Sequence, residues 1–293
     1  MTSILNIVLP TFVVILIGFL IGKRRKTANM SVLVDIAFDI SGPAITFVSM
    51  LDRKIVLLDA GKIWASALLI MFGCGIVAWI VFKFLRQKHS ALYLPISIMN
   101  TVNLPFPIIY LAFGSTGLFA ATLFCIPNIL LLYSLGIFIA AGKHWKEGVR
   151  EIARVPILYA AILGLVFNLL DIRLPEVIMN SLNLIATMAI PLVLIILGYN
   201  LSRIKISSIP TTIVSSVLRI GVGLLFGLLA VEIFHLEGIL KAVVILDSAM
   251  PAAVNAAVIA TKYDNESDMV SSVVFLTTVI SVISIPFLLG ILS

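Results

Sequence analysis

The chain has 293 residues, of which 61% are hydrophobic and only 12% are charged. This composition excludes an ordinary soluble protein, because soluble domains carry about 25% charged residues. The net charge of +6 does not indicate nucleic-acid binding, since the basic residues cluster in short segments between apolar runs. Apolar runs of about 20 residues, long enough to cross a bilayer, recur along the chain. We therefore expect an all-α polytopic membrane protein.

The apolar pattern predicts ten membrane-spanning helices in a single domain, 1–293. The first run has no basic n-region and no small-residue cleavage site, so we expect it to be a retained span rather than a signal peptide. The longest connection, "GKHWKEGVREIAR" at 142–154, is predicted to lie on the membrane surface as a short basic amphipathic helix. The predicted spans are 3–22, 31–51, 62–85, 91–113, 115–141, 156–171, 177–200, 211–233, 238–261 and 267–291.

Basic residues are distributed unevenly between the two sides of these predicted spans. The loops after odd-numbered spans hold 14 of them, and the opposite loops hold 4. Because Lys and Arg are retained on the cytoplasmic side, both termini are predicted to face outward across the inner membrane of the cell. The larger set is Lys23, Arg24, Arg25, Lys26, Lys83, Arg86, Lys88, Lys143, Lys146, Arg150, Arg154, Arg203, Lys205 and Lys262, and the smaller set is Arg53, Lys54, Lys62 and Arg173.

The chain divides near residue 148 into two halves, 1–147 and 148–293, with five predicted spans each. An odd number of spans makes the two halves run in opposite directions through the membrane. Prolines occur at matching places, in the second span of each half (Pro43 and Pro191) and in the fourth (Pro105 and Pro251). Interrupted spans at matching positions of an inverted repeat indicate the binding site of a transporter.

Proline explains why a membrane helix would break in "SIMNTVNLPFPI" (97–108). It removes a backbone donor and frees carbonyls that lipid cannot satisfy. The half-helix after the break offers N–H groups that suit an anion, and the half-helix before it offers carbonyls. Asn100, Asn103 and Asn255 could cap these groups or hold a ligand. The alternative is a pair of proline kinks packed with polar caps.

Among the charged residues of the predicted spans, three lie away from the span ends, where a charge is costly and is a candidate for function. Asp247 precedes Pro251 by one helical turn and could bind a proton or a cation, or it could cap its helix. Asp39 is a second candidate for coupling, with a structural role equally open. Arg219 could neutralise an anionic substrate or pair with an aspartate.

Three classes of function were compared. A channel would need a continuous pore, and no repeated filter sequence is present. A membrane-embedded enzyme would need a nucleophile–base pair or metal ligands, and the sequence has no H-E-x-x-H, no G-x-S-x-G pair and no histidine deep in a span. A secondary transporter accounts for both the broken spans and the matching halves.

The segments "NTVNLPFPIIYLAFGSTGL" and "SAMPAAVNAAVIATKYDNES" resemble the auxin efflux carrier family, which includes bacterial members and plant PIN-like carriers. The resemblance covers the whole chain and implies the fold of bile-acid symporters and sodium–proton antiporters. It implies that spans 4 and 9 cross near the midplane, that spans 1, 2, 6 and 7 form a scaffold, and that the other spans move. One departure is Val102, where family members often have glycine, so the first break depends on Pro105 and Pro107.

The resemblance also implies the substrate and the residues that line its site. We expect a homodimeric carrier of small organic anions, such as malate, malonate or auxin-like acids, with no cofactor, no metal and possible coupling to H⁺ or Na⁺. A sodium-coupled carrier similar to bile-acid symporters is the alternative. The candidate substrate-binding residues are Asn100, Thr101, Asn103, Pro105, Pro251 and Asn255.

The charge distribution generates a test of orientation. Cysteines introduced at Lys26 and Lys146 should resist impermeant thiol reagents in intact cells, whereas a cysteine at Asp171 should react. Labelling is measured before and after the cells are opened, and labelling of the first two positions from outside would reverse the predicted topology.

Overall fold

The computed structural model describes residues 2–25, 29–141 and 150–292. Within these ranges the chain is helical, and its one extended pairing is an isolated antiparallel bridge between Met99 and Ala252. Seven helical stretches are long and apolar enough to cross a membrane. This confirms an all-helical, multi-pass membrane protein, whereas ten spans in two inverted repeats stay a prediction.

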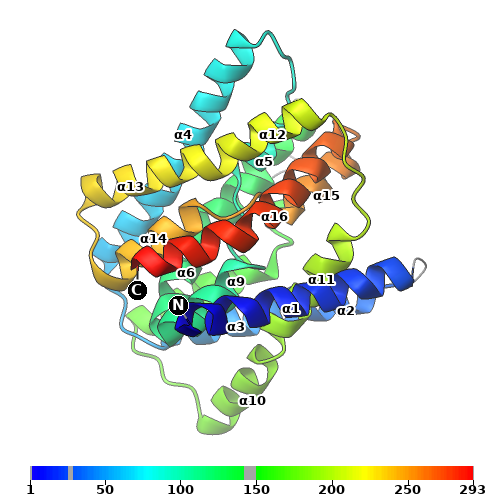
Figure 1. The fold of residues 1–293 in the computed structure, drawn as a ribbon. Coiled ribbons are helices and arrows are strands. Elements are labelled where there is room, and N and C mark those ends of the chain that lie inside the picture. The colour runs from blue at the N-terminus through cyan, green and yellow to red at the C-terminus, as the bar shows by residue number, and fades with distance from the viewer. Residues whose placement is uncertain (1, 26–28, 142–149, 293) are drawn as a thin grey trace.

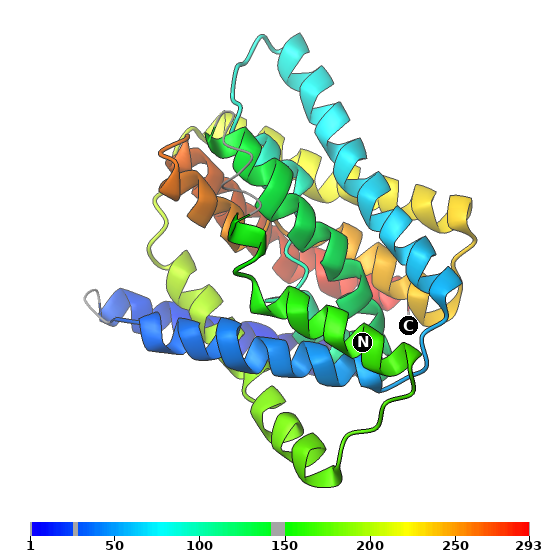
Figure 2. The same ribbon diagram turned by 180° about the vertical axis from the view of Figure 1, so that it is seen from behind.

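The helices form two groups that can be followed in Figures 1 and 2. In the first helix group, α1 lies along α11, while α3 packs against α9 and α10. Helix α10 projects away from the rest of the molecule (Figure 1). The members are α1 (Thr2–Arg24), α2 (Ser31–Asp35), η1 (Ile36–Ser41), α3 (Gly42–Leu51), α9 (Pro156–Leu169), α10 (Glu176–Ala186) and α11 (Ala189–Leu201).

The second helix group contains the other described helices. Helix α6 packs against α4 and α14, α13 against the same two helices, and α16 against α12 and α15. The members are α4 (Leu57–Phe84), α5 (Tyr93–Ser97), α6 (Pro105–Leu131), η2 (Leu132–Gly136), α7 (Ile137–Ala141), α12 (Ile209–Val217), η3 (Leu218–Val222), α13 (Gly223–Phe234), α14 (Gly238–Ser248), α15 (Val254–Lys262) and α16 (Ser267–Leu292).

Proline and glycine explain several irregularities in these helices. Pro191 cannot donate to the carbonyl four residues earlier, and the predicted span 177–200 is indeed divided at Thr187 and Met188 into α10 and α11. Pro127 leaves the Leu123 carbonyl free within α6, and the Trp64 indole N–H donates to it at 3.0 Å. Gly114 has φ 64° and ψ −156°, which bends the chain between the predicted spans 91–113 and 115–141.

Some predicted boundaries were wrong. Helix α4 begins at Leu57 rather than at 62, because an acidic residue in the first turn, Asp59, suits a helix N-terminus that extends beyond the apolar run. Helix α9 ends at Leu169 instead of 171. The predicted surface helix at 142–154 has its first eight residues, 142–149, outside the described part of the chain.

Glycines allow α1 and α11 to pack with their backbones in contact. A Cβ at Gly18 would overlap the Ile195 carbonyl, and one at Gly198 would overlap the Ile15 carbonyl. Small residues at membrane helix interfaces permit this close approach. The pairing of α1 with α11 holds the first helix group together, so these two glycines should be sensitive to substitution.

Gly198→Ala should destabilise the protein by about 1–3 kcal/mol, because the added methyl group forces the two helices apart. The matched control is Gly61→Ala in α4, where a Cβ would meet no atom within 4 Å. Thermal unfolding of both variants in detergent measures the effect. Equal stability of Gly198→Ala and the parent would contradict the close packing of α1 on α11.

Candidate functional site

Two helices are interrupted within the second helix group. Helix α5 ends at Ser97 and α6 begins at Pro105, while α14 ends at Ser248 and α15 begins at Val254. The intervening segments, 98–104 and 249–253, contain extended backbone at Ile98 (φ −97°, ψ 114°) and Ala253 (φ −65°, ψ 132°). Each segment contains or directly precedes a proline that cannot continue a helical hydrogen-bond ladder.

The two interrupted segments cross and pair with each other. The Asn100 N–H donates to the Pro251 carbonyl at 2.8 Å, and the Ala253 N–H donates to the Ile98 carbonyl at 3.1 Å. Two segments far apart in the sequence thus provide hydrogen-bond partners for some of each other's backbone N–H and C=O groups. We call this arrangement, residues 98–104 with 249–253, the crossover.

Side chains from other helices satisfy further polar groups of the crossover. Asn128 of α6 donates through Nδ2 to the Met99 carbonyl at 2.9 Å and to the Thr101 hydroxyl at 3.0 Å. The Thr277 hydroxyl of α16 accepts the Ala252 N–H at 3.1 Å. A buried backbone group without a partner costs about 1–3 kcal/mol, so these bonds stabilise the unwound segments.

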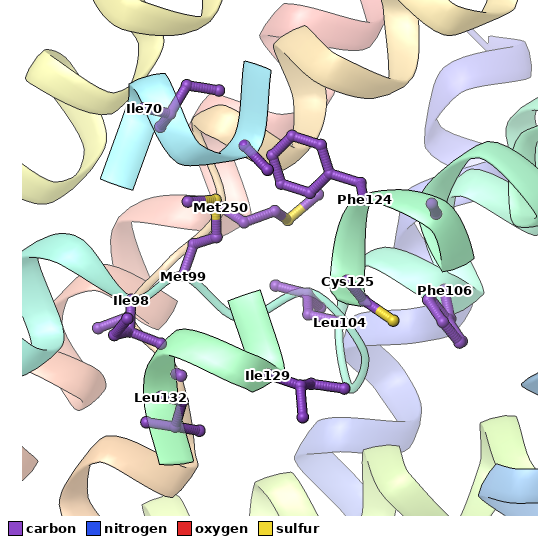
Figure 3. Packing of buried hydrophobic residues seen from close by; sticks show 14 of the residues in the cluster. Ile70, Ile98, Met99, Leu104, Phe106, Phe124, Cys125, Ile129, Leu132 and Met250 are labelled. Atoms are coloured by element: carbon purple, nitrogen blue, oxygen red, sulfur yellow. The ribbon is translucent and has the colours of Figure 1, made fainter. Parts of the chain in front are cut away.

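Apolar side chains surround the crossover. Figure 3 shows Ile98 and Met99 on one extended segment and Met250 on the other, enclosed by residues of α6 such as Phe124 and Ile129. Met99 and Met250 are fully buried. The irregular backbone therefore lies inside the protein rather than against lipid, which is the condition under which it is tolerated in membranes.

Two adjoining cavities, of about 290 Å³ and about 60 Å³, lie beside the crossover. Both are lined by Asn103 and Asn255, and the smaller one also by Asn100 and Thr101. Four of the six predicted substrate-binding residues thus gather at one place. The larger cavity extends along the first helix group and is also lined by Val34, Asp35, Phe38, Asp39, Tyr133, Arg154, Val155, Pro156, Ile157, Ile196, Asn200, Val254 and Val258.

The asparagines present unused hydrogen-bonding atoms at these cavities. Asn100 accepts the Asn103 N–H through Oδ1 at 3.0 Å, which leaves its buried Nδ2 without a partner. Asn128 uses Nδ2 as a donor, so its buried Oδ1 is the unpaired acceptor. Within the described residues, the side-chain amide of Asn103 makes no hydrogen bond. Donors and an acceptor are therefore available to a ligand.

The N-terminal ends of α6 and α15 also lie at the cavities. Val102 and Asn103, just before α6, and Val254 and Asn255, the first residues of α15, all contribute to the lining of the smaller cavity. The positive end of the helix dipole favours an anion at such a place. The first turn of α6 adds few N–H groups, because Pro105 and Pro107 have none and the Phe106 N–H donates to the Val102 carbonyl at 3.3 Å. Pro105, at the start of α6, and Pro251, in the crossover, are both buried and line neither cavity.

The three charged candidates lie in different surroundings. Asp39 is exposed and lines the larger cavity, together with Asp35. Asp247 is fully buried in α14, lines neither cavity, and has no hydrogen-bond partner for either carboxylate oxygen among the described residues. Arg219 is also fully buried, and it donates to backbone carbonyls at the ends of α5 and α14. It lines neither cavity and forms no ion pair with an aspartate among the described residues, while a role toward an anionic substrate stays a prediction.

Three π-helical segments occur near the crossover in the described chain, and each carries a polar residue, two of them charged candidates. Asp39 lies in η1, Tyr133 in η2 and Arg219 in η3. A π-helical turn inserts a residue into a helix and re-aims its side chains, and it is frequent at functional sites. Among the residues that the structure describes, no three His, Cys, Asp or Glu side chains gather where they could hold a metal ion.

Comparison with known proteins identifies the family. The family model described as "Membrane transport protein" matches residues 145–289. An uncharacterized transporter of Methanothermobacter thermautotrophicus is 30% identical over 203 residues, which cover 68% of this chain and 67% of that protein. The chain belongs to this membrane transport family, that of the auxin efflux carriers. An uncharacterized transporter of Methanocaldococcus jannaschii is 26% identical over 96% of both chains, and the uncharacterized transporter YfdV of Escherichia coli is 22% identical over 90% of both.

The predicted resemblance is thus confirmed, and this auxin efflux carrier family member is a membrane transport protein. Sequence reasoning missed Asn128, Tyr133 and Thr277 as neighbours of the crossover. Asn128 carried a usable signal, because it is a lone amide inside the apolar run 115–141. Tyrosine and threonine are common in membrane helices, so Tyr133 and Thr277 carried no signal in the sequence that set them apart.

Proposed function

We propose that this protein is a secondary active transporter of small organic anions that works by alternating access. The observation that carries the proposal is the crossover of two interrupted helices beside a cavity lined by asparagine side chains. The substrates that fit are mono- or dicarboxylates, such as malate or malonate, or auxin-like acids, which the family resemblance suggests.

Chemistry at the cavity supports a carboxylate as the bound group. The N-terminal ends of α6 and α15 supply partial positive charge, and Asn100 and Asn103 supply amide donors. Hydrogen bonds to a charged group contribute about 1.5–3 kcal/mol each. A carboxylate has two oxygens that can accept from two donors at once. This suits the smaller cavity, which offers several donors and whose described lining contains no basic side chain.

The two helix groups support an elevator-type movement. The larger cavity lies between them, since its lining includes Asp39 and Asn200 from the first group and Asn103 and Asn255 from the second. It also reaches Arg154, which belongs to the predicted cytoplasmic side. We propose that this conformation is open to the cytoplasm, that the first group is the scaffold of a homodimer, and that the second group carries the substrate.

Asp247 is the proposed coupling residue. An ionised carboxylate that is fully buried without a partner is too costly to persist, so the group must be protonated or hold a cation in this conformation. Hydration of α14 in another conformation would allow release of that ion. Sodium coupling, as in carriers similar to bile-acid symporters, is the alternative to proton coupling.

A thermal-shift screen of the purified protein tests the proposed substrate class. A ligand that binds only the folded state raises stability by about 2.7 kcal/mol at one hundred times its Kd. Malonate, malate and indole-acetate are each titrated with pH and sodium varied, and saturable uptake into vesicles separates a carrier from a channel. An enzyme would instead alter the solute. The absence of stabilisation and of uptake with every acid would refute the proposed substrate class.

Asn103→Ala should weaken carboxylate binding by about ten- to a hundredfold while the protein still inserts and folds. Folding should survive because the side-chain amide of Asn103 makes no hydrogen bond within the described chain, while its backbone N–H keeps its bond to Asn100 Oδ1. Binding is measured by calorimetry with whichever acid stabilises the parent. Asn180→Ala, at an exposed position of α10, is the matched control. Unchanged affinity in Asn103→Ala would remove the crossover from the substrate site.

Asp247→Asn should uncouple transport from its driving gradient, because asparagine keeps the shape of the side chain but cannot ionise. Exchange of substrate across proteoliposomes should continue, whereas accumulation against a gradient should fail. Asp39→Asn, on the cavity wall, is the comparison. Accumulation by Asp247→Asn equal to that of the parent would make Asp247 structural, and loss of accumulation in Asp39→Asn would then move coupling to Asp39.

A further inference from the structure

The buried guanidinium of Arg219 reaches both interrupted helices. Its Nη1 donates to the carbonyl of Ile96 at 2.8 Å and to that of Ser97 at 3.4 Å, at the end of α5. Its Nη2 donates to the carbonyl of Ser248 at 2.6 Å, at the end of α14. One side chain from η3 therefore contacts the last turns of two helices that lie far apart in the sequence.

These carbonyls need partners because the helices stop. The last four carbonyls of a helix have no N–H from a following helical turn. Here Ile98, after α5, is extended, and Ala249, after α14, has φ −95° and ψ 6°, so neither helix continues. Inside a membrane protein no bulk water replaces the missing donor. A planar guanidinium with several N–H groups in a fixed fork can serve two helix ends at once, which the compact ammonium of lysine cannot.

Arg219 has no acidic partner that would account for its burial. Within the described residues, the ion pairs involve His89, Glu151, Arg154, Lys262 and Glu266, and none includes Arg219. The guanidinium is fully buried and lines neither cavity. Its positive charge is therefore compensated by the carbonyl oxygens of the two helix ends, whose partial charges are negative.

The local sequence makes room for this contact. Gly223 lies one turn after Arg219, and a Cβ at that position would overlap both the Nη2 of Arg219 and the carbonyl oxygen of Ser248. Glycine there lets α13 approach the end of α14 closely. By contrast, a Cβ at Gly221, which lies in η3 with Arg219, would meet no atom within 4 Å.

We propose that Arg219 is the positioning residue of the crossover: it fixes the ends of α5 and α14 relative to each other and joins both to the α12–η3–α13 helix as one unit. The crossover then keeps its shape when that unit moves. This inference concerns the geometry of the crossover and holds for any substrate, whereas its consequence for transport rests on the proposed function.

Hydrogen exchange of the full-length protein, read by mass spectrometry, tests this role without a substrate. The reporters are crossover amides with defined partners, those of Asn100 and Asn103 in the first segment and of Ala252 and Ala253 in the second. In Gly223→Ala the new methyl group displaces the guanidinium from Ser248, and exchange should rise about tenfold or more in both segments. Gly221→Ala is the matched control and should exchange like the parent.

Arg219→Lys gives a second measurement that keeps the charge and removes the fork. Both segments should again exchange about tenfold faster, while the amides of α1, in the other helix group, keep the parent rate. The proposal would be overturned if, in either Gly223→Ala or Arg219→Lys, both segments exchanged as slowly as in the parent. It would also be overturned by loosening of one segment alone, or by an equal rise in α1, which would indicate general destabilisation.

Discussion

Unwound backbone inside an apolar interior must find hydrogen-bond partners within the protein, and this constraint governs the centre of the molecule. The two interrupted segments meet part of the need for each other, through Asn100 with Pro251 and Ala253 with Ile98. Two further backbone groups of these segments bond to side chains: the Met99 carbonyl accepts from Asn128, and the Ala252 N–H donates to Thr277. These bonds hold helices that are distant in sequence together at one point.

The binding cavity follows from the same constraint. Where each helix resumes after its interruption, its first residues face open space rather than a preceding turn, and Asn103 and Asn255 lie there. A cavity with helix N-termini on one side and amide groups on the other is suited to a carboxylate. The interruption of the backbone, which would be costly in a membrane on its own, thus creates the polar surface that the proposed transport of anions needs.

Two buried ionisable side chains near the crossover differ in how they are satisfied. The Arg219 guanidinium has carbonyl partners on two helices, whereas the Asp247 carboxyl has no partner among the described residues. A buried charge held by hydrogen bonds, as Arg219 is through Nη1 and Nη2 but not through Nε, stabilises one arrangement, while a buried charge with none depends on a proton or cation that can leave. This difference supports the proposed positioning role of Arg219 and the proposed exchangeable ion at Asp247.

The sequence alone determined the class of protein, the family and the places where helices break. These properties depend on local chemistry: apolar length sets the spans, and Pro105, Pro251 and Pro191 remove backbone donors wherever they stand. Only the tertiary structure decided that Asn128 and Thr277 support the crossover and that Arg219 contacts carbonyls at two helix ends. It also decided that Asp247 lies away from the cavities while Asp39 lines one. Those outcomes depend on which helix faces which, and that is set by long-range packing, such as the close contact at Gly223, which no local pattern records.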